Sequence, residues 1–520
     1  MGFLNSVLFW DVLFLIAFVI LTILFLKKKS KKVVAEGGMF LYKTKIGLKV
    51  IDKIAKKHPR LLRFLGYIIV FLGYILMIGM IALLAQFVYI FTKPELVKII
   101  KIPPLAPLIP YLPKIFKINW LPNLYFTYWI IAIAVIAIVH EGFHGIYARL
   151  HNIKIKSTGF GFLGPLLAYP FVSKNKKKAI TITAIITLIC LFLGFFVLAF
   201  FAFIPIIVFL AFFVEQDDND MQKKKIFPQL TVLGAGVFAN ILVGIIFYLI
   251  MVGFFFSFYA PAGAMINIYP TNQAFILDSN NLETGQETLI LYGNNLTQVI
   301  IKNKSYFAYN FFLENIETLD SFPVFQDQPG IRNNILGDDP IAKTSITKVD
   351  DYEIHSFQEL KNTIVENYNP GDEVNIEVKR NGGIVNYEIE LGEDYENPGM
   401  PVIGVVFDGG VEGWRRVLYD VVEMNYLKDP STYYAPKGDS QTIQFFFDLL
   451  WWLVLINISV ALVNMLPVAI FDGGRFFYLS VLGLTKSEKI AKAAFKFVTI
   501  LFLLILVLLM FLWAVNLGIL

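Results

Sequence analysis

The chain contains very little cysteine and few charged residues. Cys190 is the only cysteine among 520 residues, so neither an intramolecular disulfide nor a cysteine-based zinc site can form. Charged residues make up 16% of the chain, whereas soluble proteins have about 25%. This composition excludes a disulfide-stapled secreted scaffold and a disordered chain. Hydrophobic residues make up 57%, which instead indicates a multi-pass α-helical membrane protein.

The few charges are unevenly distributed. Residues 259–440 hold 28 of the 40 acidic residues but only 12 of the 45 basic ones, so the rest of the chain is strongly basic. Those basic residues lie mainly in short clusters between apolar runs. This pattern is typical of loops that orient a membrane protein, and it gives no support to nucleic-acid binding.

Apolar runs of about 20 residues suffice to cross a bilayer as helices. Lys27–Lys29 follow the first run and place its end in the cytoplasm, so the N-terminus lies outside. Alternation along the chain then places the acidic segment 259–440 outside as well. The run 179–213 lies between two basic clusters, which predicts a tight or re-entrant hairpin. The predicted runs are 5–26, 64–93, 124–149, 179–213, 231–257, 444–468 and 494–518.

The acidic segment carries the alternating pattern of strands. Strands are predicted at 345–349, 373–378 and 384–391. A helix is predicted between the first two strands, with Ser356 as N-cap and Glu359 completing a capping box. This order of elements resembles the second half of a PDZ domain, over about residues 330–395. The predicted fold is therefore a multi-pass helical membrane protein with an inserted, strand-rich α+β extracytoplasmic domain.

The third apolar run contains His140-Glu141-Gly142-Phe143-His144. Histidines four residues apart lie on one helix face, about 5–6 Å from each other, and both can reach one zinc ion at about 2.0–2.1 Å. Glu141 flanks that metal, where it can take a proton from bound water. Ionisable groups at membrane depth are costly and persist mainly for function. The motif therefore predicts a zinc site in preference to histidines in a polar seam between helices.

A catalytic zinc ion needs a third protein ligand and an open position. Asp472 closes the sixth apolar run five residues after Pro467, and unwound backbone at membrane depth is tolerated only inside protein or beside a wet cavity. Gly473 and Gly474 permit a tight turn that would aim the carboxylate at the zinc. Asp472 is thus the predicted ligand. The competing interpretation is a turn residue at the membrane interface.

Two asparagines also lie in predicted apolar runs, Asn240 in the fifth and Asn464 in the sixth. Asn464 can donate hydrogen bonds to a carbonyl oxygen as it gains charge, or it can bond the backbone freed by Pro467. Asn240, close to Gly234 and Gly236, is interpreted as a structural link between helices.

Together these motifs resemble the site-2 protease family of intramembrane zinc metalloproteases, in its PDZ-containing branch. The matching pieces are His140–His144, Gly159-Phe160-Gly161, Ala235-Gly236 with Asn240, and Asn464-x-x-Pro467-x-x-x-x-Asp472-Gly473. The resemblance implies one zinc ion per chain, held by His140, His144 and Asp472. It also implies that Glu141 is the general base and that Asn464 assists at the scissile carbonyl.

The resemblance further implies that the loop with Gly159 and Gly161 is β-like and binds an extended substrate. One departure concerns this loop, because the run 179–213 separates it from Phe213-Val214-Glu215, a segment that usually follows closely.

Four regions follow from these predictions. Residues 1–94 form two N-terminal spans with a cytoplasmic loop, and 95–258 form the first half of the membrane protease core. Residues 259–440 are the extracytoplasmic region, and 441–520 are the second half of the core with the last span.

The predicted function is zinc-dependent cleavage of transmembrane segments in single-pass membrane proteins. One alternative is a membrane-anchored zinc peptidase of protein quality control with a glutamate as third ligand. Another is a non-enzymatic scaffold with structural zinc, although such a site has four protein ligands and the sequence offers three. The expected partners are the substrates and the lipid bilayer, with no nucleic acid. The expected location is the cell membrane.

Overall fold

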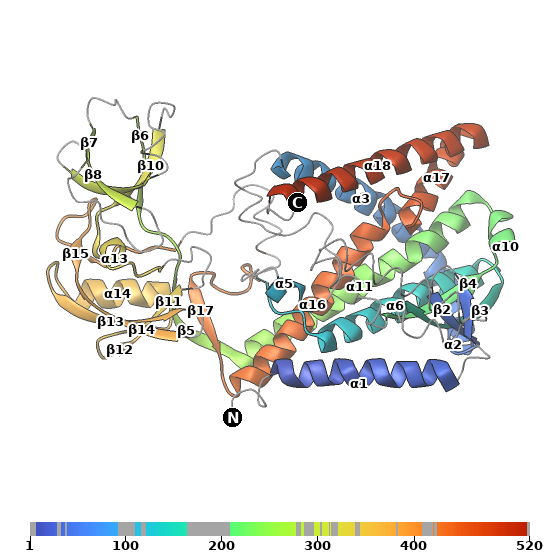
Figure 1. The fold of residues 1–520 in the computed structure, drawn as a ribbon, viewed down its shortest axis with the longest axis horizontal. Coiled ribbons are helices and arrows are strands. Elements are labelled where there is room, and N and C mark those ends of the chain that lie inside the picture. The colour runs from blue at the N-terminus through green and yellow to red at the C-terminus, as the bar shows by residue number, and fades with distance from the viewer. Residues whose placement is uncertain are drawn as a thin grey trace, which may run out of the picture. The chain divides into compact units, whose positions relative to one another are not determined.

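The computed structural model describes most of the chain (Figure 1). The described residues are 7–28, 33–36, 39–91, 110–115, 121–163, 209–276, 282–284, 296–301, 304–310, 313, 321–337, 344–380, 383–407, 420 and 424–516. The chain divides into two compact units. The membrane unit comprises residues 1–251 and 446–520, and the sheet-rich unit comprises residues 252–445.

Long apolar helices build the membrane unit, as predicted. Five described helices are long and apolar enough to cross a bilayer: α3 (Pro59–Phe91), α6 (Phe126–Leu150), α11 (Ile226–Phe258), α16 (Ser440–Asn464) and α18 (Glu488–Asn516). Helix α1 (Val7–Lys28) coincides with the predicted first span, and its apolar stretch is shorter. The protein is therefore an integral membrane protein with several spans.

The predicted hairpin 179–213 lies mostly outside the described residues. Its last residues, 209–213, are not helical but belong to strand β4 (Phe209–Gln216). β4 pairs with β3 (Ile155–Leu163), so that Gly159 lies opposite Phe213. The long insertion thus leaves the pairing of these two segments intact.

β3 and β4 belong to a four-stranded antiparallel sheet that the sequence did not reveal. Its order is β1-β2-β3-β4, with β1 (Val33–Glu36) and β2 (Met39–Thr44) following the first span. Helix α2 (Leu48–Lys57) follows this hairpin and packs on α3 and α6. The remaining short helices described in this unit are α5 (Leu112–Ile115) and α10 (Asp218–Gln222).

The C-terminal part of the membrane unit contains a break that positions Asp472. α16 ends at Asn464, earlier than the predicted 468, and α17 (Asp472–Thr485) starts after a short non-helical segment. α17 then packs against α18. Fully buried Tyr147, Met465 and Phe476 belong to one hydrophobic cluster, which joins α6 to this break and to α17.

A buried carboxylate fixes the start of α6. The N-cap of α6, Tyr125, makes no side-chain cap bond, and Asp11 of α1 supplies the cap instead. Its carboxylate accepts hydrogen bonds from the backbone N–H groups of Phe126 and Thr127, at 2.7 and 2.8 Å, and from the hydroxyls of Thr127 and Tyr111. A helix N-terminus has four unpaired N–H groups and favours negative charge, so Asp11 anchors α1 to α6.

The sheet-rich unit has the elements that the acidic segment predicts. A six-stranded sheet has the order β14-β13-β11-β5-β17, with β12 paired to β11. Helix α14 (Phe357–Asn367) begins where expected: the Ser356 hydroxyl accepts a hydrogen bond from the Glu359 N–H at 3.1 Å. The strands are β5 (Tyr259–Ile266), β11 (Thr344–Val349), β12 (Tyr352–Glu353), β13 (Glu373–Arg380), β14 (Gly383–Glu390) and β17 (Thr432–Pro436).

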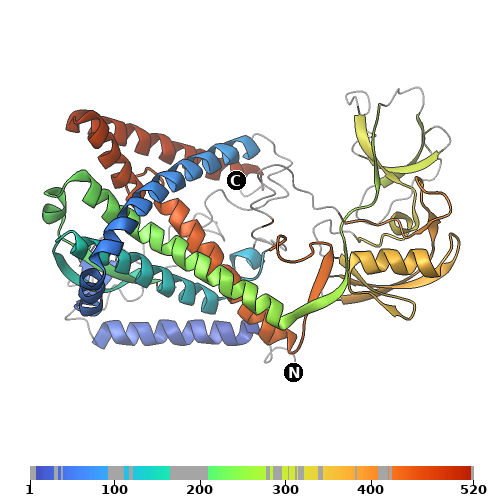
Figure 2. The same ribbon diagram turned by 180° about the vertical axis from the view of Figure 1, so that it is seen from behind.

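A second sheet of five strands, seen from behind in Figure 2, has the order β6-β10-β9-β8-β7. Its strands are β6 (Thr271–Ile276), β7 (Leu282–Thr284), β8 (Leu296–Ile301), β9 (Lys304–Tyr309) and β10 (Ser321–Gln326). The short elements α13 (Pro329–Arg332), β15 (Gly392–Glu393) and β16 (Pro401–Val402) complete the described part of the unit.

Candidate active site

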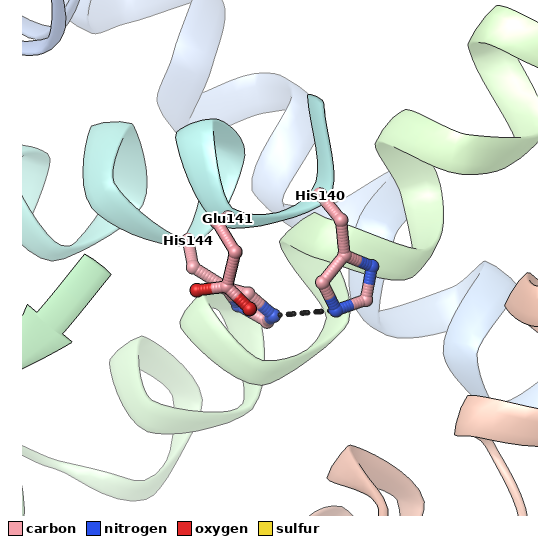
Figure 3. A group of neighbouring side chains, drawn as sticks. All are labelled: His140, Glu141 and His144. Carbon is pink, nitrogen blue, oxygen red and sulfur yellow. Dashed lines mark hydrogen bonds between the residues drawn. The ribbon is translucent and has the colours of Figure 1, made fainter. Parts of the chain in front are cut away.

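The two histidines of the motif lie inside the membrane unit, one turn apart on α6. His140 is 7% exposed and His144 is 5% exposed, and their Nε2 atoms lie 3.0 Å from each other (Figure 3). At this distance one ring nitrogen can donate a hydrogen bond to the other, and both can instead bind one cation placed between them.

Asp472 completes a triangle with these nitrogens. Its Oδ2 atom lies 3.2 Å from Nε2 of His140 and 3.3 Å from Nε2 of His144. Ligand atoms bound to a tetrahedral zinc ion at about 2.0–2.1 Å are roughly 3.3 Å from one another. The donor set of two imidazoles and one carboxylate, with these spacings, therefore fits a zinc ion.

The break between α16 and α17 brings Asp472 to the histidines. Asp472 is the first residue of α17, and the two glycines that follow it lie in the first turn of that helix rather than in a tight turn. Side chains at Gly473 and Gly474 would collide with the backbone of Met465 and Val468. The prediction that these glycines form a tight turn was therefore wrong. They instead permit close packing of α17 on the segment that precedes it.

Helix α11 passes directly behind the histidines, where it presents Gly236. A Cβ atom at this position would lie 2.5 Å from Nε2 of His144 and 2.7 Å from both Cε1 and Nε2 of His140. Real Cβ contacts are essentially never this short. The sequence showed a pair of small residues, Gly234 and Gly236, but not that one of them touches the histidines.

The other ring nitrogens of the two histidines also have partners on α11. His144 Nδ1 lies 2.6 Å from the carbonyl oxygen of Val232, and His140 Nδ1 lies 3.1 Å from Nδ2 of Asn240. Asn240 is fully buried, and its Oδ1 atom has no hydrogen-bond partner among the described residues.

A histidine that binds metal through Nε2 carries its proton on Nδ1 and donates it to an oxygen. Val232 already offers such an oxygen to His144. Rotation of the Asn240 amide by 180° pairs Oδ1 with His140 Nδ1–H and satisfies the orphaned atom, because amide oxygen and nitrogen are assigned from the network. Asn240 thus links two helices, as expected, and does so through the imidazole of His140.

Glu141 lies beside the triangle. Ligand atoms of His140, Glu141 and His144 lie within 4.8 Å of one another (Figure 3). Oε2 of Glu141 accepts a hydrogen bond from the backbone N–H of Val214 in β4, at 3.2 Å. Because Asp472 approaches both nitrogens more closely, it is the better third ligand. Glu141 is therefore not needed as a metal ligand and can serve another role.

A cavity of about 330 Å³ opens in front of these groups. It is large enough for water and a short stretch of polypeptide, since one water needs about 30 Å³. Asn464, the last residue of α16, lines this cavity together with Phe212 of β4. The other polar residues that line it are His140, Glu141 and Asp472.

Gly159 and Gly161 lie apart from the lining of this cavity. They belong to β3, which pairs with β2 on one side and β4 on the other. A side chain at Gly159 would collide with the carbonyl oxygen of Tyr42 in the neighbouring strand β2. The expected binding of an extended substrate to this loop requires an unpaired strand edge, but β3 is an interior strand of the sheet; among the described strands, β4 forms the edge beside Glu141.

The fold and the site define a class of membrane-embedded metallopeptidase, with a His-Glu-x-x-His helix inside a bundle of apolar spans. Residues 128–509 match the family model of peptidase family M50, and the chain belongs to this family, the site-2 protease family. Family membership supports an intramembrane metalloprotease. The search of curated proteins finds no match.

Proposed function

We propose that this protein is a zinc-dependent endopeptidase that cleaves transmembrane segments of single-pass membrane proteins. One zinc ion per chain is held by His140, His144 and Asp472. The observation that carries this proposal is the triangle of ligand atoms, 3.0, 3.2 and 3.3 Å apart, at the wall of a cavity that also contains Glu141 and Asn464.

Zinc, when bound, lowers the pKa of its water and polarises the scissile carbonyl. Glu141 acts as general base: it takes a proton from the attacking water and delivers it to the leaving amine. Its hydrogen bond from Val214 holds the carboxylate at the cavity. Asn464, on the same cavity, donates a hydrogen bond to the carbonyl oxygen as negative charge develops there.

The substrate must unwind, since a transmembrane helix satisfies all its own backbone hydrogen bonds. The Val214 N–H that reaches Glu141 points away from β3, which is the one partner of β4 among the described strands, so this side of β4 offers backbone groups to a further strand. An extended substrate on this edge lies beside Glu141. Gly159 and Gly161 act on the substrate only indirectly in this arrangement, as residues of the interior strand β3, where Gly159 leaves room for β2 and β4.

The proposal includes an orientation in the cell membrane. The lysines at the end of α1 favour a cytoplasmic location for that end, and in the proposed orientation the N-terminus and residues 259–440 lie outside. The sheet-rich unit, as a PDZ-like domain, then filters the extracytoplasmic parts of the substrates.

The test is a pair of substitutions with zinc content as the second readout. Glu141→Gln keeps the shape of the side chain but cannot take a proton, so zinc should stay near one per chain while cleavage of a transmembrane reporter falls about 10²–10⁴-fold. His144→Ala should lose both zinc and activity. Full activity of Glu141→Gln would refute the mechanism.

Two alternatives make different predictions. A quality-control peptidase with a glutamate as third ligand would keep its zinc after Asp472→Ala, whereas the proposed site would lose it. A scaffold with structural zinc would cleave no reporter in any lipid, and its zinc would have four protein ligands. Zinc stoichiometry and reporter cleavage of the wild type beside Asp472→Ala and Asp472→Glu separate these cases.

A further inference from the structure

Helix α2 has an apolar face that the described chain does not cover. Ile51 and Ala55 are buried against the protein, but Ile46, Val50 and Ile54 are 59%, 60% and 40% exposed. These three residues recur every four positions, from just before the helix into its second turn, and therefore form one stripe.

Lysines lie next to this apolar stripe. Lys49, Lys53, Lys56 and Lys57 are all exposed. An exposed apolar stripe flanked by lysines is the pattern of a helix that lies in the plane of a membrane interface. The place of α2 in the chain also fits a helix at the membrane interface, because only His58 separates α2 from Pro59, where the spanning helix α3 begins.

A basic pocket of about 650 Å³ lies at the C-terminal end of α2. Its charged lining residues are Asp52, Lys56, Arg63, Arg149, Lys154 and Asp220. Asp52 is paired with Arg149, with Oδ1 and Nε 2.9 Å apart. Lys56, Arg63 and Lys154 form no salt bridge within the described part of the chain, so the pocket has an excess of positive charge.

The surroundings of the pocket are positive as well. Burial lowers the pKa of His151, which directly precedes the pocket residue Asn152, and the charges of Arg63 and Lys224 lower it further. The pocket also lies at a membrane boundary: Arg63 is in the second turn of the span α3, and Arg149 is in the last turn of the span α6. Basic pockets at the ends of spans are positions at which anionic lipid headgroups bind.

We propose that α2 and this pocket bind an anionic phospholipid. The phosphate of the headgroup lies among Lys56, Arg63 and Lys154, since lysine and arginine both bind phosphate oxygens. The stripe Ile46–Val50–Ile54 enters the boundary between headgroups and acyl chains. Charge complementarity favours phosphatidylglycerol or a similar anionic lipid over a zwitterionic one.

The same helix supports the helix of the proposed active site. Gly145, the neighbour of His144, leaves room for Ile51: an added Cβ would lie 2.9 Å from Cδ1 of Ile51. The salt bridge between Asp52 of α2 and Arg149 of α6 joins these two helices about one turn beyond Gly145. A lipid that holds α2 in place therefore also holds the end of α6 that carries His144.

The experiment measures lipid binding to the full-length protein, independently of proteolysis. Purified protein in a neutral detergent is titrated with phosphatidylglycerol or phosphatidylcholine, and bound lipid is counted by native mass spectrometry. The test variant is Lys56→Gln/Arg63→Gln/Lys154→Gln. The matched control is Lys486→Gln/Lys489→Gln/Lys496→Gln, which removes the same charge from exposed positions elsewhere in the membrane unit.

The wild type and the control should prefer phosphatidylglycerol. Each basic residue near an anionic surface strengthens binding about fivefold, so the pocket variant should bind phosphatidylglycerol about 100-fold more weakly. Equal weakening in both variants, or no lipid preference in the wild type, would overturn the site. Competition by millimolar inorganic phosphate would assign the pocket to a soluble phosphate instead. Unchanged zinc content and melting temperature establish that the variants are folded.

Discussion

The contact between Gly236 and the two imidazoles makes the substitution Gly236→Ala a sensitive test of the proposed metal site. The new methyl group would lie 2.5 Å from Nε2 of His144 and 2.7 Å from Nε2 of His140. Ordinary contacts are about 3.5 Å or longer, so the overlap approaches about 1 Å at both rings. The rings cannot easily move away from the methyl group, because Val232 and Asn240, on the same helix α11 as Gly236, hold the Nδ1 atoms of His144 and His140.

Overpacking of this kind costs about 1–3 kcal/mol. If the imidazoles move to relieve it, the zinc affinity falls by a similar free energy, which corresponds to about 5- to 150-fold. A misplacement of about 1 Å also costs roughly 100-fold in rate. Gly236→Ala should therefore be folded, bind zinc more weakly and be nearly inactive.

Zinc affinity is measured by competition with a fluorescent chelator, and activity by cleavage of a transmembrane reporter. Gly253→Ala, on the same helix with nothing within 4 Å of the new Cβ, should leave zinc binding unchanged. The three nearest atoms to a Cβ at Gly234 all belong to Ile69, so Gly234→Ala should lower the melting temperature without altering zinc affinity. Wild-type zinc affinity together with full activity in Gly236→Ala would refute the placement of the metal.

Further predictions concern other parts of the molecule. Asn240→Ala should weaken zinc binding about 10- to 100-fold, because His140 loses the group that orients it; an unchanged affinity would leave Asn240 as a helix link only. Asp11→Ala leaves the start of α6 uncapped and should destabilise the protein by about 2 kcal/mol or more, seen as a lower melting temperature, whereas Asp11→Asn should recover part of the loss. Burial alone would raise the pKa of Asp327, but hydrogen bonds from Arg332 and Ser305 outweigh it and hold the pKa below its usual range. Its stabilising contribution should therefore be complete above about pH 4 and fade as the pH falls through the lowered pKa, and Asp327→Asn should remove this part of the pH dependence of unfolding. A cysteine introduced at Glu366, with Cys190 replaced, should react with an impermeant reagent from outside the cell and one at Lys489 only from the cytoplasm; labelling of both from one face would contradict the proposed topology.

The sequence predicted the parts of the site whose signal is local. His140 and His144 share a helix face by their spacing alone, and Asp472 stood out as a carboxylate at the end of an apolar run. The direct contacts of α11 with the histidines were not predictable, because Val232, Gly236 and Asn240 reach them from about 90–100 positions away. Small and amide residues in an apolar helix have the same pattern whether they face lipid, another helix or a metal ligand.

The same distinction separates the predicted from the unpredicted parts of the fold. Apolar runs and the capped helix at Ser356 are continuous signals, and the helices and strands that they predict are present. The sheet of the membrane unit depends on pairing between β2 and β3, where Tyr42 lies opposite Phe160. Short strands so far apart have no periodicity that links them, so the sequence could not show that β3 is an interior strand.

β4, the edge strand beside Glu141 among the described strands, has a direction as well as a position. β4 runs antiparallel to β3, so a segment that joins β4 in antiparallel fashion must run in the same direction as β3. Antiparallel pairing is slightly more stable per residue than parallel pairing. A transmembrane segment crosses the bilayer with a fixed N-to-C direction and can present only that direction to the edge. The strand would therefore select substrates by their orientation in the membrane. Two reporters can carry the same segment inserted in opposite orientations. The reporter whose segment unwinds along the direction of β3 should be cleaved faster.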